Sequence, residues 1–139
     1  MLLGSQTKKL HEVHSFLLKV VNNNCPELRA LQEGPRLEQR VNLTLVVLVI
    51  PVKHDEPQID KCFATVTKEF STGGISLVLD SPRSLDRLIL GLRWEGEMRF
   101  IAARACHLSP MGAGFYQLGV ELLEMVRIGD CPALAKAGF

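Results

Sequence analysis

The sequence has no excess of charge of one sign and no long hydrophobic run. It contains 16 Lys and Arg residues against 15 Asp and Glu residues, and this balance argues against bulk DNA or RNA binding, which needs a large basic surface. The longest apolar stretch, 43–51, is about half of the roughly 20 residues that a membrane-spanning helix needs. We therefore expect no membrane insertion, although a few well-placed cations could still bind a small anionic ligand.

Cysteines and aromatic residues are also few. The four cysteines, Cys25, Cys62, Cys106 and Cys131, form no C-x-x-C pair and have no histidine at the spacing of a zinc site, so we expect reduced thiols and no metal centre. One Trp, one Tyr and six Phe give little material for the exposed stacking surface of an RNA-binding barrel. We rank that class of protein last.

The first residues do not have the order of a signal peptide. A signal peptide carries its positive charges before its apolar segment, whereas here Lys8 and Lys9 follow the short apolar start. The sequence therefore predicts a cytoplasmic protein.

The N-terminal part of the chain has a helical pattern over 6–21. Apolar residues recur there at steps of three and four, which gives the helix one apolar face; these residues are Leu10, Val13, Leu17, Val20 and Val21. The face could pack on the rest of the same chain, which is the default expectation. It could instead pair with a second copy to form a homodimer, or with a partner protein.

From residue 41 onward the pattern changes to that of β-strands. About six strands are predicted, over 41–50, 62–68, 75–79, 88–94, 98–106 and 116–122. Glu95-Gly96 is a compact hairpin signal between two of them. Closely spaced antiparallel strands favour a small barrel or sandwich. The last segment, 125–139, is expected to form a short helix around 133–137 or a loose tail.

Two short motifs stand out against this background. Arg36 and Arg40 lie four residues apart just before the first strand, and Glu69-Phe70-Ser71-Thr72-Gly73-Gly74 interrupts the second and third strands. Each motif alone is weak, because arginine pairs are usually solvated and a Ser-Thr-Gly-Gly segment is usually only a turn.

Together, in this order and at this place, the two motifs resemble the PilZ family. That family has R-x-x-x-R before its first barrel strand and [D/N]-x-S-x-x-G at a later strand junction. The segments 103–106 and 117–122 also look like its closing strands. The resemblance covers 34–124 and implies a six-stranded antiparallel split β-barrel. We therefore expect a helical segment at 1–33, the barrel at 34–124 and a tail or short helix at 125–139.

The resemblance also implies a ligand, cyclic di-GMP, and a set of ligand-binding residues: Arg36, Arg40, Glu69, Ser71, Gly73 and Gly74. The chemistry fits, because an Arg guanidinium can bond the O6 and N7 atoms of guanine, stack on a purine and pair with phosphate. Ser71 would offer a hydroxyl, and glycine would let the main chain approach the base.

Glu69 departs from the pattern, because relatives carry Asp or Asn there. Its extra methylene moves the carboxylate outward and adds rotamer freedom that binding must freeze. Pro35 also precedes the first arginine, where many relatives carry a basic residue. Both differences could weaken binding or favour one ligand molecule over a stacked pair.

No catalytic residues are predicted. His11 and His14 lie on the margin of the helix face, and His54 lies in a polar turn. Cys106 and His107 are neighbours on a strand, where successive side chains point to opposite faces, so the two are expected to diverge. The predicted function is a cyclic di-GMP receptor that changes conformation and signals to a partner protein. The alternative is an interaction module of the same fold with lost or weakened nucleotide binding.

Overall fold

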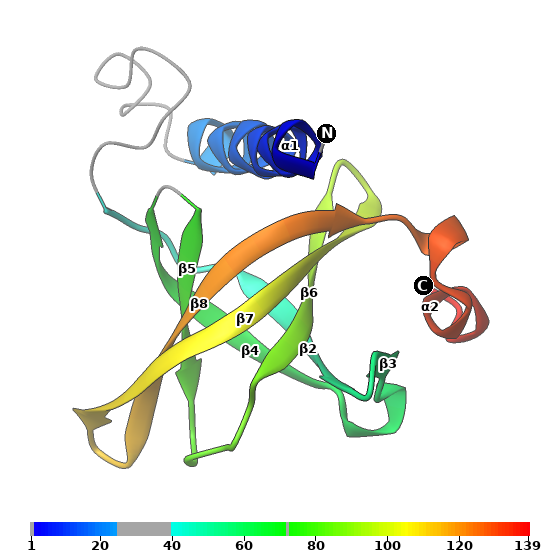
Figure 1. The fold of residues 1–139 in the computed structure, drawn as a ribbon. Coiled ribbons are helices and arrows are strands. Elements are labelled where there is room, and N and C mark those ends of the chain that lie inside the picture. Colours follow the sequence, from blue (N-terminus) through cyan, green and yellow to red (C-terminus); the bar gives the residue numbers. More distant parts are fainter. Residues whose placement is uncertain (1, 25–39, 72) are drawn as a thin grey trace.

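The computed structural model describes residues 2–24, 40–71 and 73–139, and these form a strand barrel with one long helix and one short helix (Figure 1). The elements are α1 (Leu2–Asn24), β1 (Val41–Asn42), β2 (Val46–Lys53), β3 (Glu56–Pro57), η2 (Ile59–Lys61), β4 (Phe63–Ser71), β5 (Gly74–Leu79), β6 (Arg87–Trp94), β7 (Glu97–Gly112), β8 (Phe115–Val126), η3 (Ile128–Asp130) and α2 (Pro132–Lys136).

The six longer strands form a closed antiparallel ring. β2 pairs with β4, after which β5, β8, β7 and β6 follow in order, and β6 pairs back with β2. The two-residue strands β1 and β3 add to β4 and β2. The predicted six-stranded barrel with an N-terminal helix is therefore confirmed. A closed ring also leaves no long strand edge open to pairing with another chain.

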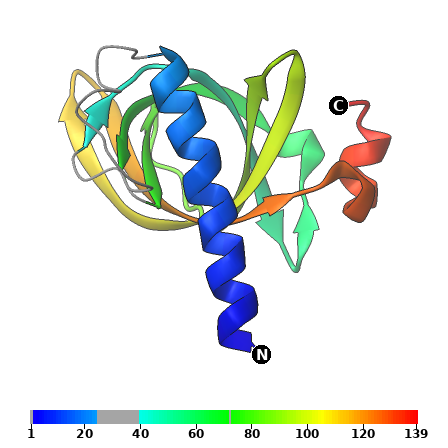
Figure 2. The same cartoon turned by 90° about the horizontal axis from the view of Figure 1, so that it is seen from above.

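The main core fills the ring and continues under α1. Alternate residues of each strand point inward, and Figure 2 shows α1 lying across one open end of the ring. Phe16 and Leu17 of α1 are buried against the strands, and Phe16 meets Trp94 edge to face at 6.0 Å between ring centroids. Of the three expectations for the helix face, packing on its own barrel is the one observed. The helix is also longer than the predicted 6–21.

A second, smaller core lies outside the ring. Ile50, Ile89 and Phe100 point outward from β2, β6 and β7, and Leu134 of α2 is fully buried among them. Of the two expectations for the C-terminal segment, the short helix is therefore observed. α1 has 23 residues, but no helix in the described ranges combines sufficient length with the apolar character needed to cross a membrane.

The prediction of one strand over 41–50 is wrong. The chain leaves the strand geometry at 43–45, between β1 and β2. The physical reason is Thr67, a buried residue of β4, whose hydroxyl donates to the carbonyl of Leu43 at 2.6 Å and accepts from the N–H of Leu45 at 2.8 Å. This side chain satisfies backbone groups that the strand ladder would otherwise pair. β7 is also longer than predicted, because its pairing with β8 continues to Gly112.

Candidate functional site

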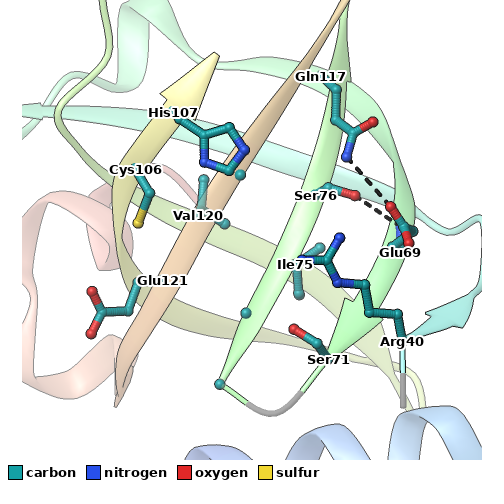
Figure 3. A pocket seen from close by; sticks show the side chains of 13 residues that line it. Arg40, Glu69, Ser71, Ile75, Ser76, Cys106, His107, Gln117, Val120 and Glu121 are labelled. Carbon is teal, nitrogen blue, oxygen red and sulfur yellow. Dashed lines mark hydrogen bonds between the residues drawn. The ribbon is translucent and has the colours of Figure 1, made fainter. Parts of the chain in front are cut away.

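A pocket of about 340 Å³ lies on the outer face of four neighbouring strands, β4, β5, β8 and β7 (Figure 3). Most of its lining residues are polar or small, which suits a polar ligand better than a lipid. The lining residues are Arg40, Glu69, Ser71, Gly73, Gly74, Ile75, Ser76, Cys106, His107, Gln117, Gly119, Val120 and Glu121.

The structure brings most of the predicted site residues together in this pocket. Arg40 lies about thirty residues before the second motif in the sequence, yet both line the same cavity because β1 pairs with β4. The sequence-predicted residues found there are Arg40, Glu69, Ser71, Gly73 and Gly74. Arg36 lies outside the described residues.

The turn that carries the second motif is fixed by a glycine. Ser71, the last residue of β4, pairs with Gly74, the first residue of β5, and Gly73 has a φ of +74°, which favours glycine. The N–H of Leu122 donates to the carbonyl of Gly73 at 2.8 Å. A Cβ atom at position 73 would also lie 3.2 Å from Nε2 of His14 in α1. Gly73 is therefore hydrogen-bonded to β8, and His14 of α1 leaves little room for a side chain at this position.

Glu69 faces the pocket because β4 contains a β-bulge. The register with β5 shifts between Thr67 and Glu69, so Lys68 and Glu69 both lie on the outer side while Thr67 stays buried. The N–H of Glu69 donates to Oγ of Ser76 at 3.0 Å, and Nε2 of Gln117 donates to Oε1 of Glu69 at 3.4 Å. Lys68 in turn donates to Oε1 of Gln117 at 3.1 Å. This chain of bonds restrains the longer carboxylate side chain.

The charges of the pocket are divided between its two sides. Figure 3 shows the guanidinium of Arg40 pointing over β5, between Ser71 and Ser76. On the far side, Glu121 accepts a hydrogen bond from Arg104, and this bond and the carboxylate charge raise the pKa of Arg104 above its ordinary value. Among the described residues, no carboxylate lies within ion-pair distance of Arg40.

The expectation that Cys106 and His107 diverge is wrong. Both line the pocket, because the register between β7 and β8 shifts between Ala105 and His107. The bulge inserts Cys106 as an extra residue, so the strict alternation of side chains fails at this point. His107 then comes to lie opposite Gly119.

Four register partners form one row across the pocket floor, and sequence reasoning found only the first of them. The row runs across β4, β5, β8 and β7 through Glu69, Ser76, Gly119 and His107. Alternation along 116–122 did indicate that Gln117 and Gly119 point outward. Nothing in the local sequence indicates which strands become neighbours or where a bulge turns His107 toward them.

The histidines and cysteines of the described ranges form no metal site. No group of three or more His, Cys, Asp or Glu side chains is placed there so that it could hold a metal ion. Cys62, Cys106 and Cys131 are free thiols, while Cys25 lies outside the described residues.

Comparisons with known proteins find likeness only among solved structures. No protein-family model and no curated protein sequence matches the chain. The Bacillus subtilis inhibitor of motility, MotI/DgrA, is similar at 24% identity and a TM-score of 0.46, over 76% of this chain and 49% of that one. The PilZ domain of CeSA from a cellulose-synthesizing bacterium is similar at 17% identity and a TM-score of 0.43, over 72% of this chain and 94% of that one. The chain thus spans about half the length of the MotI/DgrA structure.

Proposed function

We propose that this protein is a receptor for cyclic di-GMP that passes the signal to a partner protein. The observation that carries the proposal is the meeting of Arg40 with Glu69, Ser71 and Gly74 in one pocket. These residues belong to two motifs far apart in the sequence, and the motifs resemble those of a nucleotide-binding family. Such a receptor needs no catalytic group, and with a second messenger as its ligand it would act in the cytoplasm.

The pocket offers a group for each part of the ligand. Glu69 can accept hydrogen bonds from the N–H groups of a guanine edge, since a carboxylate is an acceptor only. The guanidinium of Arg40 can pair with a phosphate or bond O6 and N7 of guanine. Ser71 supplies a hydroxyl, and Gly74 lines the pocket with main-chain atoms alone. Arg36, four residues before Arg40, would add a second guanidinium.

Calorimetry with cyclic di-GMP tests the proposal. We expect saturable binding by the wild-type protein, and each of the variants Arg36→Ala and Arg40→Ala should weaken it by about tenfold or more, because each loses charge-assisted contacts. Arg93→Ala is the matched control, because Arg93 is an exposed arginine on β6 that does not line the pocket. Absence of heat and of a ligand-induced thermal shift in the wild type would contradict the receptor function.

A groove beside α1 favours the second candidate function, a protein-interaction module. The groove has a volume of about 900 Å³ and lies between the helix and the β6–β7 hairpin, with Phe16, Trp94 and Met98 among its lining residues. Both a receptor and a simple interaction module could dock a protein there. They differ in one measurement, because only the receptor changes its capture of a partner when cyclic di-GMP is added.

A further inference from the structure

His107 lies over a glycine across the β7–β8 strand pair. His107 and Gly119 are register partners, and a Cβ atom at position 119 would lie 3.0 Å from Cε1, 3.3 Å from Nδ1 and 3.6 Å from Nε2 of the imidazole. Three ring atoms at such similar distances mean that the glycine meets the face of the ring and not its edge. Glycine at 119 is therefore the residue that allows this ring position.

The same strand carries a second aromatic ring over a glycine. Phe100 is the register partner of Gly91, and a Cβ atom at position 91 would lie 2.9 Å from Cε of Met98 and 3.1 Å from Cε1 of Phe100. Phe139 packs on this ring at 5.4 Å between centroids, and Phe100 is only 1% exposed. His107, in contrast, is exposed. The ring of Phe100 is covered by the chain itself, whereas the ring of His107 is open to the pocket.

The exposed imidazole ends the row of register partners that begins at Glu69. The two residues between Glu69 and His107 in this row, Ser76 and Gly119, are small. No large side chain of the row therefore stands between the carboxylate and the imidazole. The imidazole lies over Gly119 of β8, and β8 and β4 are two strand spacings apart, roughly 10 Å at about 4.8 Å for each spacing. A flat group can therefore lie on the imidazole and still turn one edge toward Glu69.

We propose that His107 is a purine-stacking residue of this pocket. The inference rests on the receptor function proposed above and adds a contact that neither sequence motif contains. Bases stack on the faces of aromatic side chains, histidine included. An imidazole already held against Gly119 loses little freedom when a base covers its other face, and so the stacking is preorganised. The guanine edge then meets Glu69, and the phosphates lie toward Arg40.

Calorimetry with cyclic di-GMP on three variants of His107 tests this role. We expect His107→Ala to bind about tenfold more weakly, because it removes the ring. His107→Gln should be similarly weak, because it keeps polar atoms but has no ring face. His107→Phe should bind within about threefold of the wild type. His11→Ala is the control, since His11 is an exposed histidine of α1 outside the pocket.

A second measurement observes the ring directly. Proton resonances of the His107 imidazole should move upfield on ligand addition, because protons above a purine experience its ring current. Binding by His107→Ala equal to that of the wild type would overturn the inference and leave the receptor function standing. Full binding by His107→Gln with weak binding by His107→Phe would also overturn it, since a hydrogen bond would then be the contact. Wild-type protein that does not bind cyclic di-GMP would overturn the receptor function and this inference together.

Discussion

The outer surface of the barrel has two faces. They differ in the polarity of their side chains and in whether another part of the chain buries them. On the covered face, Ile50, Ile89 and Phe100 point outward and are buried by Leu134 of α2. On the open face, formed by β4, β5, β8 and the second half of β7, the residues that line the pocket are mostly polar or glycine. β7 runs through both faces and carries an aromatic ring paired with a glycine of the neighbouring strand in each.

The difference between the covered face and the open face indicates which part of the barrel surface can bind a ligand. Outward apolar side chains on a closed barrel must be buried by something, and on the covered face the C-terminal segment does this. The part of the open face that lines the pocket has no such demand, because its polar groups are already hydrogen-bonded or can be solvated. A polar ligand can therefore bind there without displacing any part of the core.

Replacing Phe100 on the covered face and His107 on the open face gives the largest expected contrast in stability. Phe100→Ala should lower the free energy of unfolding by about 3–5 kcal/mol, because it removes a buried ring and leaves a cavity beside Leu134. His107→Ala should change it by less than about 0.5 kcal/mol, as expected for an exposed residue. Urea unfolding measures both values. Equal losses of stability would mean that the two faces do not differ as described.

Thr67→Val should have the next largest effect, because it tests how the core supports the open face. The variant keeps the shape of the side chain but removes the hydroxyl that bonds Leu43 and Leu45. The N–H of Leu45 then loses its partner, which costs about 1–3 kcal/mol of unfolding free energy. Arg40 lies just before this segment, so cyclic di-GMP should also bind more weakly.

Thr67→Ser provides the control for that experiment. It keeps the hydroxyl and loses one buried methyl group, at a cost of about 1 kcal/mol. Calorimetry should show its ligand affinity close to that of the wild type. If Thr67→Ser weakened binding as much as Thr67→Val, packing of the methyl group rather than the two hydrogen bonds would position Arg40.

Much of this fold could be predicted from the sequence, because its signals are local. Alternation in 116–122 predicts a strand with one buried face, and Glu95-Gly96 predicts a hairpin, which the positive φ angles of both residues confirm. The helix at the N-terminus follows from its three- and four-residue spacing. The break at 43–45 depends on a tertiary contact, the hydroxyl of Thr67, that no local pattern carries.

The candidate site could be predicted less completely than the fold, because more of it depends on how strands pair. The motif residues were identified by resemblance, and the structure brings Arg40 and Glu69 into one pocket. The partners of those residues were not found, because two β-bulges decide them. Each bulge places two successive residues on one face, so the period-of-two argument fails at Cys106 and His107. A bulge arises from the pairing of two strands, which a single segment does not reveal.

The smallest expected effect concerns Gln117 and tests whether the open face is preorganised. Gln117→Ala removes the amide that restrains Glu69, so cyclic di-GMP should bind about three- to tenfold more weakly, with no change in the melting temperature. Glu69→Ala removes the carboxylate that this amide bonds. Because the two changes disrupt one contact, their effects on affinity should be less than additive in the double variant. Strict additivity, measured by calorimetry, would mean that Gln117 acts on the ligand independently of Glu69.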